Sequence, residues 1–220
     1  MKDIILIGAG GHCKVAIDII QQHENYNLIG LIDKDAQNVG NKVLQVPIIG
    51  VDKDLNEILR QGQASYALIA IGSTGDNSLR KKLYDKVKEV GYDFINAVHP
   101  NSIIAKSSRI DDGNCIMAGA IINPDVIIGN NNIINTGSII EHDTVIKNNV
   151  HVGPGVKISG GVTIGNNTHL GTGATIIQNI EVGENCLIGA GTVVINDIPS
   201  NSVVVGNPGQ VIKQRGEIDG

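Results

Sequence analysis

Apolar runs of strand length alternate with amphipathic stretches over the first 100 residues of the chain. The predicted strands lie at residues 4–7, 28–33, 66–71 and 94–98. The predicted helices lie at residues 12–22, 53–61 and 78–90. Strands that alternate with helices in this way predict a small Rossmann-like α/β domain with a parallel sheet.

After residue 100 the helical spacing disappears and a period of six residues replaces it. Every sixth residue from Ile104 to Val194 is a branched aliphatic residue, without a break. Four residues after each of these positions the residue is mostly small or β-branched. This pattern is the hexapeptide repeat of a parallel β-helix.

A second period, of 18 residues, predicts how many sides each coil of this β-helix has. Residue pairs that suit a sharp corner recur at this spacing: Asp112-Gly113, Asn130-Asn131, Asn148-Asn149, Asn166-Asn167 and Glu184-Asn185. Gly and Asn tolerate the left-handed backbone conformation that such corners require. One corner of this kind per three hexads predicts a triangular prism, in which residues 18 apart stack at ~4.8 Å. We therefore expect an α/β domain at residues 1–100 and a parallel β-helix with a C-terminal tail at residues 101–220.

The stacking rule indicates which side chains of the prism can act together. His142 is followed directly by Asp143, and its position in the hexad faces outward near a corner. Gly160 stacks over His142, so its backbone N–H could stabilise an oxyanion there. His151 lies half a coil away from His142, and the two side chains should meet only if two prisms lie side by side.

A glycine-rich turn marks the first strand–helix junction of the α/β domain. Gly10, Gly11 and His12 lie in this turn, and the N–H groups at the start of a helix are suited to bind phosphate. Asp33 ends the second strand, at the position that often contacts a ribose. Cys13 stands where the dinucleotide-binding fingerprint requires glycine, so the motif is only partial.

Composition and charge narrow the classes of partner. The chain has 17 Lys and Arg against 22 Asp and Glu, a net charge of −5, which argues against nucleic acid or an anionic membrane as partner. No apolar stretch is long enough for membrane insertion, and the N-terminus lacks the layout of a cleavable signal. The three cysteines are far apart and lack metal-site spacing, which indicates reduced thiols in a cytoplasmic protein.

The chain as a whole resembles the bacterial sugar acetyltransferases of the NeuD/PglD family. The motifs that carry this resemblance are residues 7–12, 70–72, 80–84 and 135–143, with His151 and the tail at residues 204–208. The resemblance implies a left-handed β-helix and a cytoplasmic homotrimer. It also implies direct acetyl transfer from acetyl-CoA, without a metal, to a nucleotide-linked 4-amino-4,6-dideoxy sugar, with UDP favoured as the nucleotide. The product would serve surface glycan or nonulosonic acid synthesis.

The resemblance also assigns roles to individual residues of the two domains. His142 would be the general base and Asp143 would hold it, an expectation that agrees with the chemistry of imidazole near neutral pH. The nucleotide-sugar site would include Gly10, Gly11, His12, Asp33, Lys34 and Gly72. Acetyl-CoA would contact His151, Gly160, Thr172 and Ala190. The tail departs from the family pattern at Gly209 and Gln210, because the usual lysine is missing there.

Other functions remain open at the level of sequence. An O-acetyltransferase acting on sialic acid or a related sugar would use the same base. A zinc enzyme of the γ-type carbonic anhydrase class would need three convergent histidines, but His142, His151 and His169 are spaced 9 and 18 residues apart. An NAD-dependent oxidoreductase would need a hydride-transfer site that a β-helix does not offer. A non-catalytic scaffold would leave the His142-Asp143 pair without a purpose.

Overall fold

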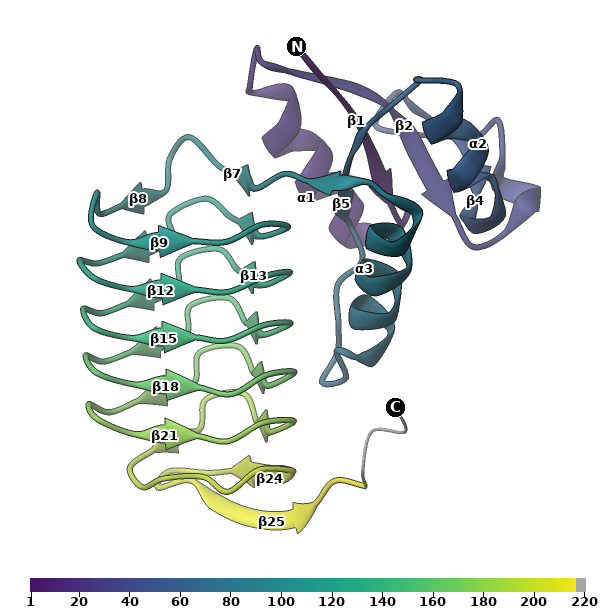
Figure 1. Cartoon of the computed structure of the whole chain (residues 1–220). Coiled ribbons are helices and arrows are strands. Elements are labelled where there is room, and N and C mark those ends of the chain that lie inside the picture. Colours follow the sequence, from purple (N-terminus) through teal and green to yellow (C-terminus); the bar gives the residue numbers. More distant parts are fainter. Residues whose placement is uncertain (217–220) are drawn as a thin grey trace.

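The computed structural model describes residues 1–216, which form an α/β domain beside a triangular prism (Figure 1). The α/β domain contains β1 (Lys2–Ile7), α1 (Gly11–Gln21), β2 (Tyr26–Asp33), β3 (Lys42–Val43), β4 (Val46–Val51), α2 (Leu55–Arg60), β5 (Tyr66–Ile69), α3 (Ser78–Val90) and β6 (Asp93–Phe94). Short 3₁₀ turns lie at Ala36–Asn38 and Asp52–Asp54. Among the described residues, none of the helices combines the length and the hydropathy that a membrane crossing requires.

The strands of the α/β domain form one sheet in the order β3-β4-β2-β1-β5-β6, parallel except for the β3–β4 pair. The strands predicted at residues 4–7, 28–33 and 66–71 and all three helices are present, with ends that differ by a few residues. Strands β3 and β4 were not predicted, because Pro47 and Gly50 interrupt the apolar pattern there. The run predicted at residues 94–98 is divided between β6 and the first strand of the prism.

The prism has three faces, each a ladder of short strands, which we call faces A, B and C. Face A holds β7 (Ala97–Val98), β10 (Cys115–Ile116), β13 (Ile133–Ile134), β16 (His151–Val152), β19 (His169–Leu170), β22 (Leu187–Ile188), β24 (Ser202–Val205) and the antiparallel β25 (Gln210–Gln214). Face B holds β8 (Ile103–Ile104), β11 (Ile121–Ile122), β14 (Ile139–Ile140), β17 (Lys157–Ile158), β20 (Thr175–Ile176) and β23 (Val193–Val194). Face C holds β9 (Arg109–Ile110), β12 (Ile127–Ile128), β15 (Val145–Ile146), β18 (Thr163–Ile164) and β21 (Glu181–Val182).

Parallel pairing in this prism joins residues 18 positions apart, as predicted. The aliphatic residues of the six-residue period fill the core, and most of them are completely buried. Ile104 and Ile110 are only partly buried, because they lie in the first coil, which no complete coil covers. Strand pairing begins at Ala97, a few residues before the predicted start of the β-helix. The fold class, a Rossmann-like α/β domain followed by a left-handed parallel β-helix, is confirmed.

Left-handed backbone conformations occur at all three corners of the coil. Corner residues that stack 18 positions apart form a file along the prism. The file predicted from sequence is confirmed at the corner between faces C and A, where φ is 78°, 57°, 58°, 60° and 54° at Gly113, Asn131, Asn149, Asn167 and Asn185. Gly137 at the corner between faces A and B and Asp143 at the corner between faces B and C have φ values of 66° and 60°. At the A–B corner a glycine recurs every 18 residues, at Gly119, Gly137, Gly155, Gly173 and Gly191. The B–C corner mixes residue types, with Asp125, Asp143, Gly161 and Asn179, which hides its period in the sequence.

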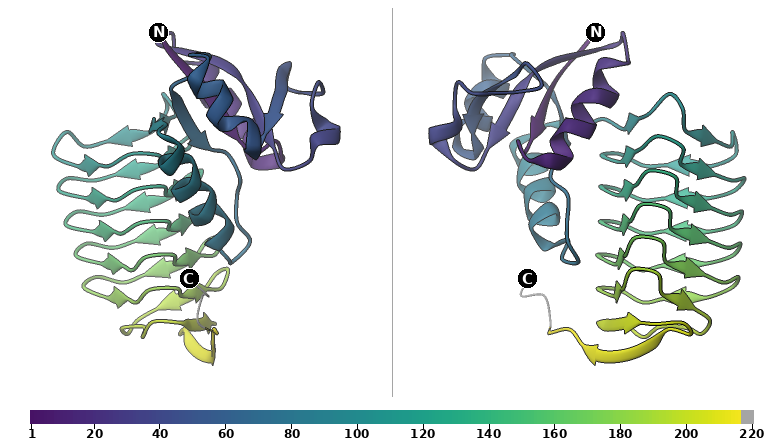
Figure 2. Two further views of the ribbon diagram at one scale, coloured as in Figure 1. Left: turned by 45° about the vertical axis from the view of Figure 1, so that its right-hand side comes forward. Right: turned by 180° about the vertical axis from the view of Figure 1, so that it is seen from behind.

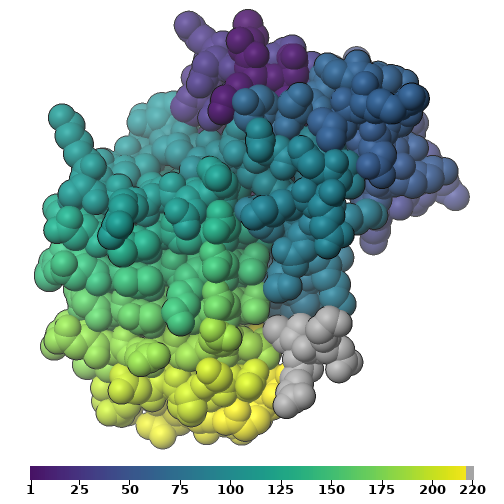
Figure 3. Space-filling model, viewed as in Figure 1, coloured from purple at the N-terminus to yellow at the C-terminus, as the bar shows by residue number. Residues whose placement is uncertain are grey.

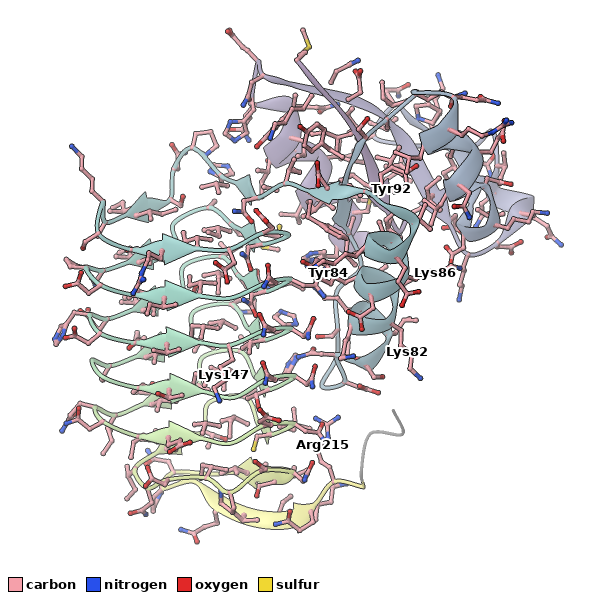
Figure 4. All side chains as sticks on the ribbon, viewed as in Figure 1. Lys82, Tyr84, Lys86, Tyr92, Lys147 and Arg215 are labelled. Atoms are coloured by element: carbon pink, nitrogen blue, oxygen red, sulfur yellow. The ribbon has the colours of Figure 1, made fainter. Side chains whose placement is uncertain are left out.

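Helix α3 lies along the C–A corner of the prism in every view (Figures 1 and 2). Tyr84 packs toward the prism, whereas Lys82 and Lys86 on the same helix reach into solvent (Figure 4). A Cβ at Gly113 would lie 2.9 Å from Cε2 of Tyr84, so the prism corner and the helix are in close contact. The two domains therefore share one continuous surface (Figure 3).

Arg80 connects the end of the α/β sheet to the prism. Its side chain is buried and donates through Nη1 to the carbonyl oxygens of Ile69 (2.7 Å) and Ile71 (2.9 Å). Its Nε donates to the carbonyl oxygen of Asn131 on the C–A corner, at 3.2 Å. Burial lowers the pKa of Arg80 to about 10, which still leaves the guanidinium charged at neutral pH.

We expect Arg80→Met to lower the free energy of unfolding by about 2–4 kcal/mol, because it leaves buried carbonyl groups of both domains without a donor. Chemical denaturation followed by circular dichroism measures this change. Lys82→Met, on the exposed side of α3, is the matched control and should change stability by less than about 0.5 kcal/mol. Equal effects of the two substitutions would contradict the role given to Arg80.

Candidate active site

A cavity of about 510 Å³ lies between the α/β domain and the prism. The α/β domain lines it with Gly11, His12, Val15, Gly72, Ser73 and Thr74, and the prism with Met117, Asn135, Thr136 and His151. Three predicted nucleotide-sugar residues, Gly11, His12 and Gly72, therefore meet in one place.

The α/β end of this cavity lies at the carboxyl edge of the sheet, between β1 and β5. The chain leaves β1 toward β2 on one side and later returns to β5 on the other, which creates the topological switch point where α/β sheets bind ligands. Gly8 makes the turn after β1 with a φ of 119°. A Cβ there would lie 2.5 Å from Cγ2 of Ile71, so only glycine fits between the two loops.

The start of α1 faces open space at this edge. A Cβ at Gly10 or Gly11 would meet no atom within 4 Å, and α1 has no acidic residue in its first turn. The unpaired N–H groups and the positive end of the helix dipole are therefore free to receive an anionic group such as a phosphate.

Asp33 and Lys34 lie at the end of β2 on the same edge, outside the cavity lining. Oδ1 of Asp33 accepts hydrogen bonds from the N–H of Asp35 (2.9 Å) and from Nδ2 of Asn38 (3.0 Å). These bonds hold the carboxylate in a fixed orientation. The assignment of Asp33 and Lys34 to the nucleotide stays a prediction.

His12 lies against Gly72, where a Cβ would be 3.4 Å from the His12 Cβ. Burial, with the charge of Arg80 adding to it, lowers the pKa of His12 to about 4. Nε2 of His12 is buried and has no hydrogen-bond partner among the described residues. A neutral imidazole with a free nitrogen in a ligand-sized cavity can bind a hydroxyl group of a sugar.

His151 is placed in this cavity, next to the predicted sugar residues. The residue is 7 % exposed, and its Nδ1 lies 2.8 Å from Oγ of Ser73. Burial lowers the pKa of His151 to about 3, with further contributions from His169, His12 and Arg80. The predicted contact of His151 with acetyl-CoA stays a prediction.

His142 and Asp143 form a pair at the B–C corner, and both side chains are exposed. Nδ1 of His142 lies 2.7 Å from Oδ2 of Asp143. This hydrogen bond raises the pKa of His142, and the negative charges of Asp143 and Glu141 add to the effect. Because Asp143 occupies Nδ1, Nε2 is left free to accept a proton.

Gly160 stacks under the ring of His142, as predicted. A Cβ at Gly160 would lie 2.7 Å from Cε1 and 2.8 Å from Nε2 of His142, so any side chain there would displace the ring. The neighbouring N–H of Gly161 donates to the carbonyl oxygen of His142 at 3.0 Å, which keeps the two coils in register at this corner.

The residues predicted to bind acetyl-CoA do not form one group on a single chain. Thr172 and Ala190 are exposed at the A–B corner, in the same file as Thr136. Gly160 lies at the B–C corner with His142, across face B, and His151 lies in the interdomain cavity. His142 does not line that cavity.

Several residues of the site were not recognised from sequence. Ser73, Thr74 and Met117 carry no motif of their own, and their positions depend on how the two domains dock. Asn135 lies within the motif at residues 135–143, but the pattern gave it no role. Among residues 1–216 there is no group of three or more His, Cys, Asp or Glu side chains arranged to hold a metal ion.

Comparisons with known proteins agree with this architecture. The sequence model of the PglD N-terminal domain matches residues 3–87, and that of the bacterial transferase hexapeptide (six repeats) matches residues 143–178 and 161–196. The chain is 37% identical over 119 residues to a UDP-N-acetylbacillosamine N-acetyltransferase of Bacillus subtilis (strain 168). That match spans 54% of this chain and 52% of the relative, about half the length of each.

Two similar solved structures extend over nearly the whole chain. A histidine variant of perosamine N-acetyltransferase from Caulobacter crescentus, in complex with CoA and GDP-perosamine, is 34% identical. It has a TM-score of 0.90, with 97% of this chain and 98% of that chain covered. The acetyltransferase domain of PglB from Neisseria gonorrhoeae FA1090, in complex with acetyl coenzyme A, is 29% identical. It has a TM-score of 0.87, with 96% and 99% covered. The chain therefore belongs to the family of PglD-type sugar acetyltransferases.

Proposed function

We propose that this protein transfers the acetyl group of acetyl-CoA to the amine of a nucleotide-linked 4-amino-4,6-dideoxy sugar, with UDP favoured as the nucleotide. The observation that carries the proposal is the His142-Asp143 pair, which leaves Nε2 of an exposed imidazole free as a base. The interdomain cavity and the open start of α1 are suited to hold a nucleotide-sugar. The related enzymes named above support the amine acceptor and the coenzyme.

In the proposed reaction the sugar amine attacks the thioester carbonyl of acetyl-CoA directly. The amine attacks in its neutral form, and Nε2 of His142 removes one proton from it as the C–N bond forms, because the attacking nitrogen would otherwise become positively charged. The carbonyl oxygen takes up negative charge, and the N–H of Gly160 is the candidate donor for it. The C–S bond then breaks, and the proton held by His142 can pass to the departing CoA sulfur. Asp143 keeps the imidazole oriented and stabilises its protonated form.

A homotrimer of parallel prisms would bring the two halves of the site together. On one chain, His142 lies at the B–C corner and the cavity opens beside face A and the A–B corner. A neighbouring prism could place its own B–C corner at the cavity.

We also place the enzyme in the cytoplasm, where the three buried free cysteines would stay reduced.

An acetyl-transfer screen tests the function. The purified protein is incubated with acetyl-CoA and, in separate reactions, with UDP-, GDP- and dTDP-linked 4-amino sugars and free sialic acid, and products are identified by mass spectrometry. We expect an N-acetylated nucleotide-sugar. Acetylation of sialic acid alone would instead identify an O-acetyltransferase, and transfer to none of the acceptors would contradict the proposal.

We expect His142→Ala to lower kcat by ~100-fold or more with little change in acetyl-CoA binding, which is the usual size of the loss for a general base. Steady-state kinetics and calorimetric titration of the coenzyme measure the two quantities. His99→Ala removes an imidazole outside both halves of the site and should leave kcat within about twofold. A His142→Ala enzyme with near-native kcat would assign the base to another residue.

The pH dependence should follow the His142-Asp143 pair. Only neutral His142 acts as base, so kcat/KM should rise as pH increases through its pKa. Asp143 raises this pKa, and Asp143→Asn should therefore move the ascending limb to lower pH, toward the ordinary value of about 6.5, and lower the plateau. If the ascending part of the kcat/KM profile stays in place or moves to higher pH in Asp143→Asn, the result would contradict the proposed effect of Asp143 on His142.

Mixed trimers test whether the site spans two subunits. Gly11→Glu places a carboxylate in the open space before α1, where it should repel a diphosphate, and Gly11→Ala is the control that fits the same space. Homotrimers of Gly11→Glu and of His142→Ala should both be inactive. A cyclic trimer that contains both variants has one subunit boundary at which an intact cavity meets an intact His142. The activity of such a trimer should therefore recover to about one third of that of the wild-type trimer. No recovery would place both halves on one subunit.

A further inference from the structure

The loop between β5 and α3 places one side chain between two histidines of the prism. Oγ of Ser73 lies 2.8 Å from Nδ1 of His151 and 3.3 Å from Nδ1 of His169. The two histidines are paired in register on neighbouring strands of face A, and their ring centroids are 4.6 Å apart. Ser73 is thus a residue of the α/β domain in contact with two stacked imidazoles of the prism.

Asn135 determines which nitrogen of His151 carries the proton. Oδ1 of Asn135 accepts the backbone N–H of Thr136 at 2.8 Å, which fixes the orientation of the amide. Nδ2 of Asn135 therefore faces Nε2 of His151, at 3.3 Å. An amide nitrogen only donates, so Nε2 of His151 must accept, and the proton lies on Nδ1.

The polarity of the remaining hydrogen bonds follows from this tautomer. The Nδ1–H of His151 donates to Oγ of Ser73, and the Ser73 hydroxyl then donates to Nδ1 of His169. Oγ of Ser73 has no other hydrogen-bond partner among the described residues. The result is a directed chain from Thr136 through Asn135, His151 and Ser73 to His169, which crosses the domain boundary twice, into Ser73 and back to the prism.

Both histidines of this chain stay neutral at physiological pH, so the chain keeps its polarity. Burial lowers the pKa of His151 to about 3 and that of His169 to about 4.

The other end of the loop between β5 and α3 is also held against the prism. Nδ2 of Asn77, a buried residue, donates to the carbonyl oxygens of Asn149 (2.8 Å) and Thr168 (3.1 Å).

We propose that Ser73 is a positioning residue for acetyl transfer. Its hydroxyl accepts the Nδ1–H of His151 and so holds the ring in one orientation, and it fixes the loop that begins at Gly72 against the prism wall of the cavity. Because His151 and Gly72 both line that cavity, one hydroxyl orients the two sides of the binding space. The kinetic part of this inference rests on the proposed function, whereas the tautomer does not.

The test compares Ser73→Ala, Ser73→Thr and a matched control, Ser102→Ala. That control removes a hydroxyl whose one hydrogen bond within residues 1–216 goes to the carbonyl oxygen of His99. Ring ¹⁵N chemical shifts of the homotrimer report the tautomer of His151, and steady-state kinetics report KM for both substrates. We expect Ser73→Ala to leave the Nδ1–H of His151 without an acceptor, to shift its ring resonances, to raise both KM values and to lower kcat/KM roughly tenfold, as expected for an unpaired buried donor. Ser73→Thr, which keeps the hydroxyl, and Ser102→Ala should resemble wild type.

Three results would overturn the inference. They are ring ¹⁵N shifts that place the proton of His151 on Nε2 in the wild-type protein, unchanged kinetics in Ser73→Ala, and a Ser73→Thr enzyme as impaired as Ser73→Ala. A wild-type protein that transfers no acetyl group would count against the proposed function, and the ring ¹⁵N shifts would still decide the tautomer.

Discussion

The vertical register of the prism is the constraint on which the rest of the structure depends. Each coil pairs residue by residue with the next one, 18 positions along the chain, so every side chain has a defined neighbour above and below. This register places Gly160 under His142 and His169 beside His151. It also lines up the asparagines of the C–A corner, where Nδ2 of Asn131 donates to Oδ1 of Asn149 at 2.8 Å. A shift by one residue would exchange core and surface positions on every strand.

The docked α/β domain gives the histidines of the protein two different electrostatic environments. His12 and His151 lie in a buried space near the charged guanidinium of Arg80, and their pKa values are lowered. His142 lies in solvent beside a carboxylate, and its pKa is raised. The proposed base, which would gain and lose a proton during each turnover, therefore lies where both forms are stable. The groups that shape the cavity lie where only the neutral form is stable.

The fold could be predicted from the sequence because its signals are local and periodic. Aliphatic residues at every sixth position must face one narrow core, and a polar corner every 18 residues closes a three-sided coil. Strands β3 and β4, at one side of the α/β sheet, could not be predicted from such a pattern, since Pro47 and Gly50 break the alternation there. The His142-Asp143 pair could also be predicted from the sequence, because the two residues are adjacent and Gly160 follows His142 by 18 positions, the spacing at which residues stack.

The cavity could not be predicted in the same way. It forms where Ser73 and Gly72 of one domain meet Asn135 and His151 of the other, and no sequence period relates these residues. Sequence reasoning grouped His151 with Gly160, Thr172 and Ala190, yet on one chain these residues occupy separate places around the prism. In the proposed homotrimer, these residues would be brought together by assembly with further copies of the chain.

A crystal structure of the His142→Ala trimer with CoA and the nucleotide-linked amino sugar tests the central claim most directly. We predict a nucleotide at the Gly11 turn of one subunit and a sugar amine directed at position 142 of the neighbouring subunit. A sugar amine directed at a histidine of the same subunit, or a nucleotide bound away from the Gly11 turn, would contradict this prediction.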